Sequence, residues 1–403
     1  MNTATLTQSP NRITQLLPSH CYLLGKYNIE IFNSVNTLPA EWDTFANKYQ
    51  AQYAKDLLGV AEKAKLTDFS YYYVIVRDRE EIKALFYFQS LVIRKEYYPD
   101  FSNLSFAAKN LYCLISAHDY NLLVNGHIFS TDVPGVVLKN NLAFSADLTQ
   151  VFEKVVSKVK SVSGSSIFII KDANALLSED LSKKRTKYKA MPDDVLMEMN
   201  LPKAWQSIDN YIEALSKKYA VRAKKIELSI SQFTLEEFNA KDILKNADVL
   251  NALYSNVISI SSFKMGILNM HYFAGLKTAL KHGFIFKVWK LNNEIVGFTS
   301  YINLVDHIEL YYIGIDYKIN KSHHLYQCML QQGIKDAIAL RKSILRLGRT
   351  AYEAKAIAGA KPVIKSNFFH ISNPILKIGY RYSADYFIAE NSTNWQVRNP
   401  FKE

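Results

Sequence analysis

The chain has 403 residues, 49% of them hydrophobic and 21% charged, and at about 150 residues per domain this length predicts two or three folded domains. Glycine (14) and proline (10) are sparse while Tyr (26) and Phe (22) are abundant, which excludes collagen-like repeats and long disordered or linker-rich tracts. The net charge of +12, from 49 Lys and Arg against 37 Asp and Glu, favours an anionic partner, although lysines that only keep the surface soluble would give the same total.

The first half of the chain alternates short strands with amphipathic helices. Apolar residues alternate over 27–35, which predicts a half-buried strand, and Pro39 suits the first turn of the helix that follows. Two β-rich runs flank a polar turn and predict a hairpin. In chain order, the predicted elements are a strand at 27–35, helices at 39–49 and 55–65, strands at 70–78, 82–93 and 127–140, a helix at 148–162 and a buried strand at 166–172.

The second half repeats this order with negligible sequence identity. Its predicted elements are a helix at 208–228 with a basic face, two or three further helices, strands at 284–293, 294–305 and 307–316, a helix at 324–342 and a strand at 343–350. Between the halves, residues 172–200 lose hydrophobic periodicity and become dense in charge, which predicts a domain boundary.

Three short motifs lie within these predicted elements. Pro39–Asp43 (PAEWD) opens the first helix, Ile208–Lys225 opens the second half and contains LSKKYAVRAKK, and Leu347–Lys355 (LGRTAYEAK) lies near the end of the chain. The element order resembles the acyltransferase fold of the GNAT superfamily. Its duplication and the motifs resemble the FemAB-like and BioF2-like (acetyltransferase-6) N-acyltransferases, over about residues 27–390.

The resemblance implies an α/β (α+β) fold of two tandem GNAT-like domains, each a mixed and largely antiparallel sheet flanked by helices. Residues 1–26 would form an N-terminal arm, 27–185 a degenerate, supporting domain, and 186–403 a domain with the catalytic groove and a C-terminal tail. It also implies an N-acyltransferase that moves an acyl group from an acyl-CoA-like thioester to an amine. Acyl-CoA would be the co-substrate, and no metal or bound prosthetic group is expected.

The strand at 307–316 is where the resemblance places the groups that face the reacting centre. Because strand side chains alternate, Glu309 and Tyr311 share one face, where Glu309 would act as general base and a tyrosine would protonate the leaving group. Tyr352 is the third catalytic candidate, on a helix that Thr350 would cap. A glutamate at a solvated strand edge and tyrosines packed in the core would give the same pattern.

Basic residues of the second half are candidates for binding an anionic donor. Gly348 would let the chain approach the substrate, while Arg349 and Lys355 would bind a phosphate or carboxylate. The predicted loop at 317–324 lacks the glycines of the usual pyrophosphate-binding loop. Side chains would hold the anion there instead, and the candidates are Lys318, Lys321 and Ser322.

The basic stretch at 217–225 is another candidate binding surface. On a helix, Lys218, Arg222 and Lys225 lie along one side, and Lys218 and Arg222 would contact CoA phosphates, tRNA or membrane headgroups. A solvated helix face explains such a charge run equally well. Both tRNA and a membrane surface therefore stay open as partners, beside a small-molecule acyl donor and an amine acceptor.

The remaining patterns exclude several other classes. Cys21, Cys113 and Cys328 are too few and too scattered for a disulfide framework or a zinc site, and the nine histidines show no metal-ligand spacing. The start of the chain lacks a secretory signal and no apolar run reaches about 18 residues, so we expect a cytoplasmic protein without a transmembrane segment. No GxSxG, Walker A or GxGxxG pattern occurs, so hydrolase, NTPase and Rossmann functions have no support.

Two other functions stay open at this point. A FemAB-like, aminoacyl-tRNA-dependent transferase acting on a cell-wall precursor fits the net charge and the basic helix, but the long helical arm of some such enzymes is missing from the sequence. A catalytically inactive, GNAT-derived binding protein fits the glycine-free stretch at 317–323.

Overall fold

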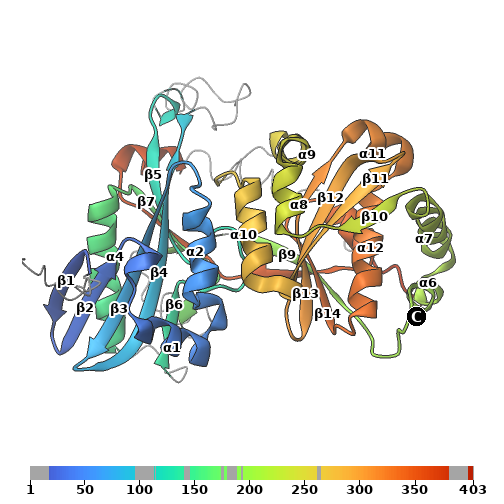
Figure 1. Ribbon diagram of the computed structural model, residues 1–403. Helices are drawn as coiled ribbons and strands as arrows, with labels where there is room; N and C mark the ends of the chain where they lie inside the picture. The colour runs from blue at the N-terminus through green and yellow to red at the C-terminus, as the bar shows by residue number, and fades with distance from the viewer. Residues whose placement is uncertain are drawn as a thin grey trace, which may run out of the picture.

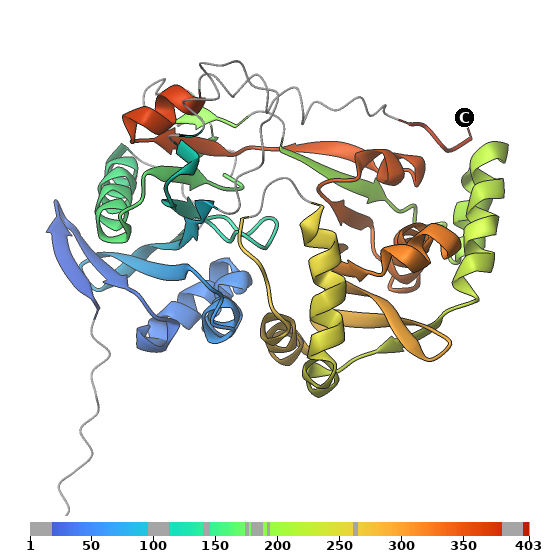
Figure 2. The ribbon, with the colours of Figure 1, turned by 90° about the horizontal axis from the view of Figure 1, so that it is seen from above.

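The computed structural model describes residues 18–95, 113, 115–139, 146–173, 177–178, 188–191, 194–260, 265–380 and 398–402. Within these residues the chain forms two mixed sheets, each flanked by helices, and they lie side by side (Figures 1 and 2). This is the α/β architecture that the sequence predicts.

The first sheet is antiparallel except where β5 and β7 run parallel. Its strands, in spatial order, are β1 (His20–Leu24), β2 (Tyr27–Phe32), β3 (Phe69–Asp78), β4 (Glu81–Ile93), β5 (Tyr120–Asn125), β7 (Ile167–Ile170), β16 (Phe368–Ile371) and β8 (Lys189–Ala190), with β6 (Val136–Leu138) paired to β4. Its central strands are buried on both faces, which explains the aromatic and β-branched runs in their sequences.

The second sheet is antiparallel except for one parallel pair, β13 with β14. Its strands, in spatial order, are β10 (Thr234–Glu237), β11 (Phe284–Leu291), β12 (Glu294–Asn303), β13 (His307–Ile315), β14 (Ile344–Gly348), β9 (Asp194–Asn200) and β15 (Lys361–Lys365).

Helices cover both faces of each sheet. In the first domain, α1 (Ala40–Tyr49) and α2 (Lys55–Lys63) cover the face towards the second domain, and α4 (Ala146–Ser163) covers the opposite face. In the second domain, the sheet face towards the first domain is covered by α8 (Ala240–Lys245), α9 (Ala247–Ser259) and α10 (Met270–Leu280). The opposite face is covered by α6 (Ile208–Ala214), α7 (Lys217–Ile230) and α12 (Leu325–Ala339). Two short helices, α11 (Tyr317–His323) and α13 (Tyr352–Ile357), follow β13 and β14.

A single hydrophobic core joins the two domains where α2 and α10 meet (Figure 1). Trp42 of α1 belongs to the same buried cluster as Phe273 of α10 and Phe286 of β11. Gly275 lets α10 approach α2 closely, because a Cβ at this position would lie 3.0 Å from Cγ1 of Val60. The domains therefore pack as closely as elements within one domain.

Among the described residues, two crossings join strands of the two sheets. The first crossing, between β8 and β9, lies inside the segment 172–200 where the sequence predicts a boundary. The second follows β15, when β16 returns to pair with β7 and places Phe368 opposite Ile170 (Figure 2). Residues 368–371 thus belong to the first sheet, which differs from the continuous second domain predicted over 186–403. β16 covers the backbone groups that β7 would otherwise expose at a sheet edge, and no local sequence pattern encodes this pairing.

Two predicted elements need correction, while the hairpin predicted at 70–78 and 82–93 is confirmed as β3 and β4. The strand predicted over 127–140 is wrong for 127–135, which forms a loop because Asp132, Pro134 and Gly135 interrupt a ladder. We call residues 127–135 the site loop. The loop predicted at 317–324 is also wrong, because Asp316 caps the helix α11 there.

Because the core is shared, Phe273→Ala should destabilise both domains together. Phe273 is fully buried in the shared cluster, and truncating a buried Phe costs about 3–5 kcal/mol of unfolding free energy. We expect urea unfolding, followed by circular dichroism, to keep one transition at a lower midpoint. Phe152→Ala, in the core beneath α4 alone, is the matched control. A variant in which one domain melts separately and the other keeps the parent midpoint would contradict the shared core.

Candidate active site

The strands β13 and β14 pair along only part of their length. Their parallel register joins His307–Glu309 to Ile344–Arg346, and β13 then continues to Ile315 without β14 as a partner. Gly348, at the end of β14, has a φ of +75°, a conformation that favours glycine. The two strands thus part directly after Glu309, and this carboxyl lies where they diverge.

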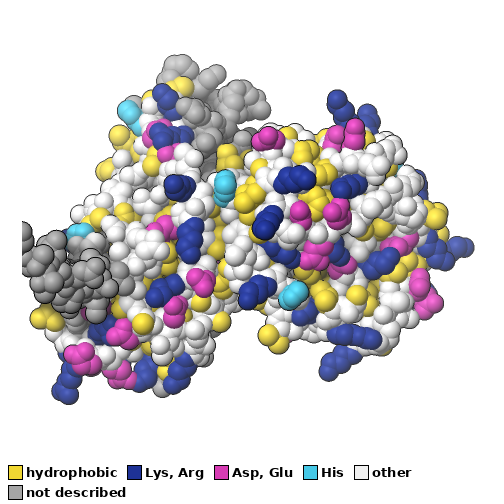
Figure 3. Space-filling view, viewed as in Figure 1, with side chains coloured by type: hydrophobic (Ala, Val, Ile, Leu, Met, Phe, Trp, Pro, Cys, Tyr) yellow, Lys and Arg dark blue, Asp and Glu magenta, His cyan; other side chains and the backbone are white. Residues whose placement is uncertain are grey.

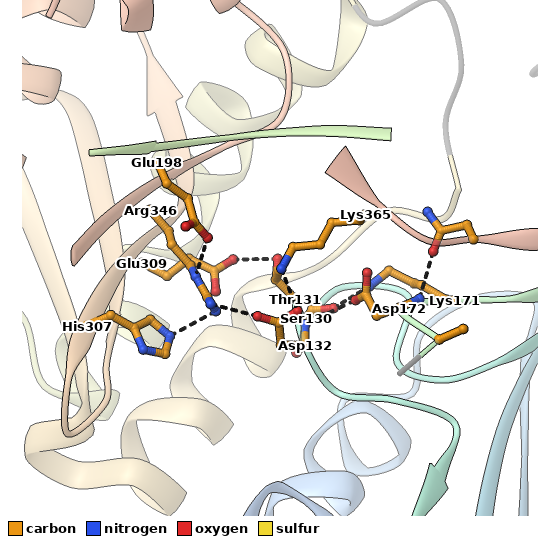
Figure 4. Close-up of polar contacts among 12 residues, drawn as sticks. Ser130, Thr131, Asp132, Lys171, Asp172, Glu198, His307, Glu309, Arg346 and Lys365 are labelled. Carbon is orange, nitrogen blue, oxygen red and sulfur yellow. Dashed lines mark hydrogen bonds and ion pairs between the residues drawn. The ribbon is translucent and has the colours of Figure 1, made fainter. Parts of the chain in front are cut away.

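Glu309 is a buried carboxyl that faces the first domain (Figure 4). Its side chain is 6% exposed, and the Thr131 hydroxyl donates a hydrogen bond of 2.8 Å to Oε1. Burial raises the pKa of Glu309, and this effect outweighs the opposing effects of the Thr131 hydrogen bond and of nearby Arg346, Lys171 and Arg349. A carboxyl with a raised pKa is a better proton acceptor than an ordinary surface glutamate.

The site loop carries Thr131 and Asp132 from the first domain to the second sheet (Figure 4). Asp132 Oδ2 lies 2.7 Å from Nη2 of Arg346, and its Oδ1 accepts a hydrogen bond of 2.8 Å from Nζ of Lys365. These cations hold the pKa of Asp132 below its usual value. Two ion pairs therefore fix the loop across the domain interface.

All three nitrogen atoms of the Arg346 guanidinium contact neighbouring side chains. Besides Asp132, Nε donates to Glu198 Oε1 at 2.8 Å and Nη1 donates to Nε2 of His307 at 3.0 Å. Since Nε2 of His307 accepts this bond, its Nδ1 carries the proton and donates to Asp306 at 2.7 Å. With all these contacts made, Arg346 positions the site rather than binding a substrate.

A second cluster joins the end of β7 to the turn after β14. Lys171 Nζ donates to Asp172 Oδ2 at 2.5 Å and to the Ser130 carbonyl at 2.6 Å. Arg349 reaches the same cluster, with Nη2 3.5 Å from Asp172 Oδ1 and Nη1 3.4 Å from Thr131 Oγ1. Arg349 thus lies beside the hydroxyl that binds Glu309.

Lys355 supports the turn that presents Arg349. It is 3% exposed, and its Nζ donates a 2.6 Å hydrogen bond to the backbone carbonyl of Arg349. Burial, together with the charge of Arg349, lowers the pKa of Lys355 to about 7. The turn itself is strained, because Thr350 and Ala351 have φ values of 66° and 47°. Lys355 therefore lies beneath the site as a positioning residue, whereas the sequence predicts an anion ligand.

Tyr311 and Tyr312 both lie at the domain interface because of a bulge. The register between β12 and β13 shifts from Thr299 to Tyr301, so β13 carries an extra residue here. The Tyr311 hydroxyl lies 2.8 Å from the Tyr272 hydroxyl, and burial raises the pKa of Tyr311. Regular alternation places Tyr312 on the opposite face, yet its ring lies 4.6 Å from the ring of Tyr311 and 6.0 Å from that of Phe273. Regular alternation therefore cannot predict that both rings pack at the interface.

The other predicted site residues lie outside this cluster. Lys318, Lys321 and Ser322 are exposed on α11, and Lys218 and Arg222 are exposed on α7. Within the described ranges, no hydrogen bond or ion pair connects these five residues to Glu309. Tyr352, half-buried on α13, packs against the core of the second domain.

Two backbone N–H groups at the start of α11 and α12 are already hydrogen-bonded within the chain. The Lys318 N–H donates to Asp316 Oδ1 at 2.8 Å, and the Tyr326 N–H donates to Asn320 Oδ1 at 2.8 Å. Backbone N–H groups of this kind bind phosphates at helix N-termini, and here a carboxylate and an amide already occupy them. These two N–H groups are therefore not available to a CoA pyrophosphate.

A narrow apolar groove of about 50 Å³ lies between α7, α12 and α13. Leu330, Ile334 and Ile357 line it, and Arg222 lies among its lining residues. Among the described residues, no group of three or more His, Cys, Asp or Glu side chains could hold a metal ion. No helix in the described part of the chain is long and apolar enough to cross a bilayer.

No protein-family model matches the sequence, and no curated protein matches it. Among solved structures, the crystal structure of FemX is similar over 84% of this chain and 97% of its own, with 10% identity and a TM-score of 0.50. The chain has a two-domain GNAT-like fold. A conserved protein of unknown function from Bacteroides thetaiotaomicron VPI-5482 (11% identity, TM-score 0.47, 82% and 96% coverage) and a tandem GNAT protein from the clavulanic acid biosynthesis pathway (8%, 0.47, 86% and 99%) are also similar. In this two-domain fold, the candidate site lies where the domains meet.

Lys355→Met should remove a pH dependence of stability. In the folded protein the pKa of Lys355 is about 7, below the usual value of 10.5, so between these pH values only the unfolded chain carries the proton. Raising the pH therefore stabilises the parent, by up to about 1.4 kcal/mol per pH unit, and the variant lacks this increase. Below pH 7 Lys355 is protonated in both the folded and the unfolded state, and the stability of the variant relative to the parent is greatest there.

The measurement is urea unfolding of both proteins from pH 6 to pH 10. Lys361→Met, at an exposed lysine on β15, is the matched control and should follow the parent. Parallel stability profiles of the parent and Lys355→Met would show that Lys355 is not held neutral by burial.

Proposed function

We propose that this protein is an N-acyltransferase that moves an acyl group from an acyl thioester, such as acyl-CoA, to an amine. One observation carries the proposal: Glu309 is a buried carboxyl with a raised pKa at the point where β13 and β14 part. The GNAT-like fold supports it, since the sequence resemblance places the reacting centre on this strand. The acceptor amine would enter at the interface, where the site loop meets Glu309.

In the proposed reaction, the amine nitrogen attacks the acyl carbonyl carbon, a C–N bond forms, and the C–S bond breaks. Glu309 accepts the proton that the amine loses. Arg349 and Lys171 supply positive charge near the oxygen that becomes negative in the transition state. Tyr311 is protonated at neutral pH, as tyrosines ordinarily are, and its hydroxyl supplies a proton to the departing sulfur.

An aminoacyl-tRNA is a second candidate donor, and one observation favours it. The N–H groups of Lys318 and Tyr326, where a CoA pyrophosphate would bind, are already bonded to Asp316 and Asn320. An ester donor would use the same base, because the amine again attacks an acyl carbon and an oxygen replaces sulfur as the leaving atom.

Glu309→Gln should slow transfer strongly while leaving the fold intact. Glutamine keeps an oxygen that accepts from Thr131, but it cannot take a proton, so kcat should fall by about 10²–10⁴. The activity of the parent should also fall on acidification, starting above the usual pKa range of a glutamate because the pKa of Glu309 is raised. The assay is release of free thiol from acetyl-CoA with a panel of primary amines.

Glu353→Gln is the matched control, since Glu353 lies on α13 and pairs with Arg398 at the surface. An active Glu309→Gln enzyme would overturn the role of Glu309. If the parent releases no thiol and transfers no aminoacyl group with any acceptor, and acyl-CoA does not shift its melting temperature, the enzyme proposal fails and an inactive binding protein is favoured.

The donor can be identified by its salt dependence. Binding to a phosphate backbone weakens steeply with salt, so retention of tRNA should fall by about 10³ or more from low to moderate ionic strength if tRNA is the donor. Acyl-CoA should then leave the melting temperature unchanged. A melting temperature raised by acyl-CoA, with no tRNA retained at low salt, would exclude the aminoacyl-tRNA alternative.

A further inference from the structure

Helix α7 is buried along one side and exposed along the other. Ala223, Ile226 and Ile230 are buried on the side that packs against α12. On the opposite side, Val221 is 63% exposed and Leu228 is 71% exposed. The helix thus presents aliphatic side chains both to the core and to the surroundings, at the outer margin of the second domain (Figure 1).

The exposed aliphatic residues form a stripe with lysines on both sides. Val221 and Leu228 are seven positions apart, so on an α-helix they point in nearly the same direction. Residues three or four positions from them on the helix are their neighbours. Those neighbours are all exposed lysines: Lys217, Lys218, Lys224 and Lys225. We call these six residues the α7 outer face.

The positive charge of this face has no acidic counterpart on the helix. Glu227 is the one acidic residue of α7, and it contacts α12 instead, accepting from Gln331 Nε2 at 2.8 Å and pairing with Lys335 at 3.4 Å. In the described part of the chain, none of the four lysines forms an ion pair. Lys and Arg side chains project at the margin of the molecule where α7 lies (Figure 3).

We propose that the α7 outer face binds the surface of an anionic lipid bilayer. Lysines bind headgroup phosphates with their ammonium groups and lay their methylene stems along apolar surface. The aliphatic stripe would enter the boundary between headgroups and acyl chains, which is how amphipathic helices lie on membranes. A nucleic acid would satisfy the lysines equally well, but it would leave Val221 and Leu228 exposed to water.

The proposal goes beyond the proposed function, because it concerns where the protein acts and not which bond it forms. Arg222 is turned away from the stripe and lines the groove beside α12, so the two surfaces of α7 are distinct. Membrane binding can therefore be measured without any acyl donor or acceptor.

The test is sedimentation of the full chain with extruded vesicles. We expect binding to vesicles of equal parts phosphatidylcholine and phosphatidylglycerol at low salt, and none to phosphatidylcholine alone. Each lysine near an anionic surface strengthens binding about fivefold, so the triple variant Lys217→Gln, Lys224→Gln, Lys225→Gln should bind about 100-fold more weakly. The double variant Val221→Ser, Leu228→Ser should bind about tenfold more weakly at unchanged charge.

Matched controls carry the same changes elsewhere. Lys63→Gln, Lys241→Gln, Lys245→Gln replaces three exposed lysines on other helices, and Val305→Ser replaces an aliphatic residue that is 97% exposed after β12. Both should bind like the parent, and all variants should keep its melting temperature.

Three results would overturn the proposal. The first is no binding to the phosphatidylglycerol vesicles. The second is an affinity of the double Ser variant for these vesicles equal to that of the parent, which would mean that charge alone causes the binding. The third is retention on single-stranded RNA that the lysine variant loses and the double Ser variant keeps, which would make nucleic acid the partner of this face.

Discussion

The carboxylate of Asp132 lies between two cations of the other domain, and the candidate site depends on this contact. Arg346 and Lys365 hold the site loop in place, and the loop in turn brings the Thr131 hydroxyl to Glu309. Losing one partner of such a partly buried network leaves the remaining charges uncompensated, which costs more than the contact itself contributes. The site is therefore a property of both domains, although its base lies on a strand of only one.

Backbone strain accumulates around the same contact. Asp132, Asp172, Thr350 and Ala351 all have φ values between 47° and 66°, in the left-handed region that is uncommon for residues other than glycine and least favourable for β-branched ones such as Thr. Each costs about 1–3 kcal/mol and persists only where the surroundings determine the conformation. Here the surroundings are the ion pairs of Asp132, the hydrogen bonds of Asp172 and the bond from Lys355 to the carbonyl of Arg349. Strained backbone of this kind occurs where geometry serves a site.

The sequence predicts the sheets and some of the site, and the limits have physical causes. The strands and the β3–β4 hairpin can be predicted from local hydrophobic periodicity. Glu309 can be predicted as a candidate base from its position on a strand together with the resemblance to the GNAT superfamily. Thr131, Asp172 and Arg346 could not be predicted, because they meet residues that are up to 218 positions away. The packing of Tyr312 beside Tyr311 cannot be predicted, because a β-bulge breaks the alternation on which the face assignment depends.

The return of β16 to the first sheet has a consequence for synthesis. The first domain emerges from the ribosome early. The strand that pairs with β7 is translated about 200 residues later, as the 195-residue separation of the Asp172–Asn367 hydrogen bond shows. Domains generally fold as they emerge, N-terminal first. In this chain, β7 remains an edge strand of the first sheet until the second domain has been translated. A nascent chain truncated before residue 368 therefore exposes a strand edge that can pair with other chains.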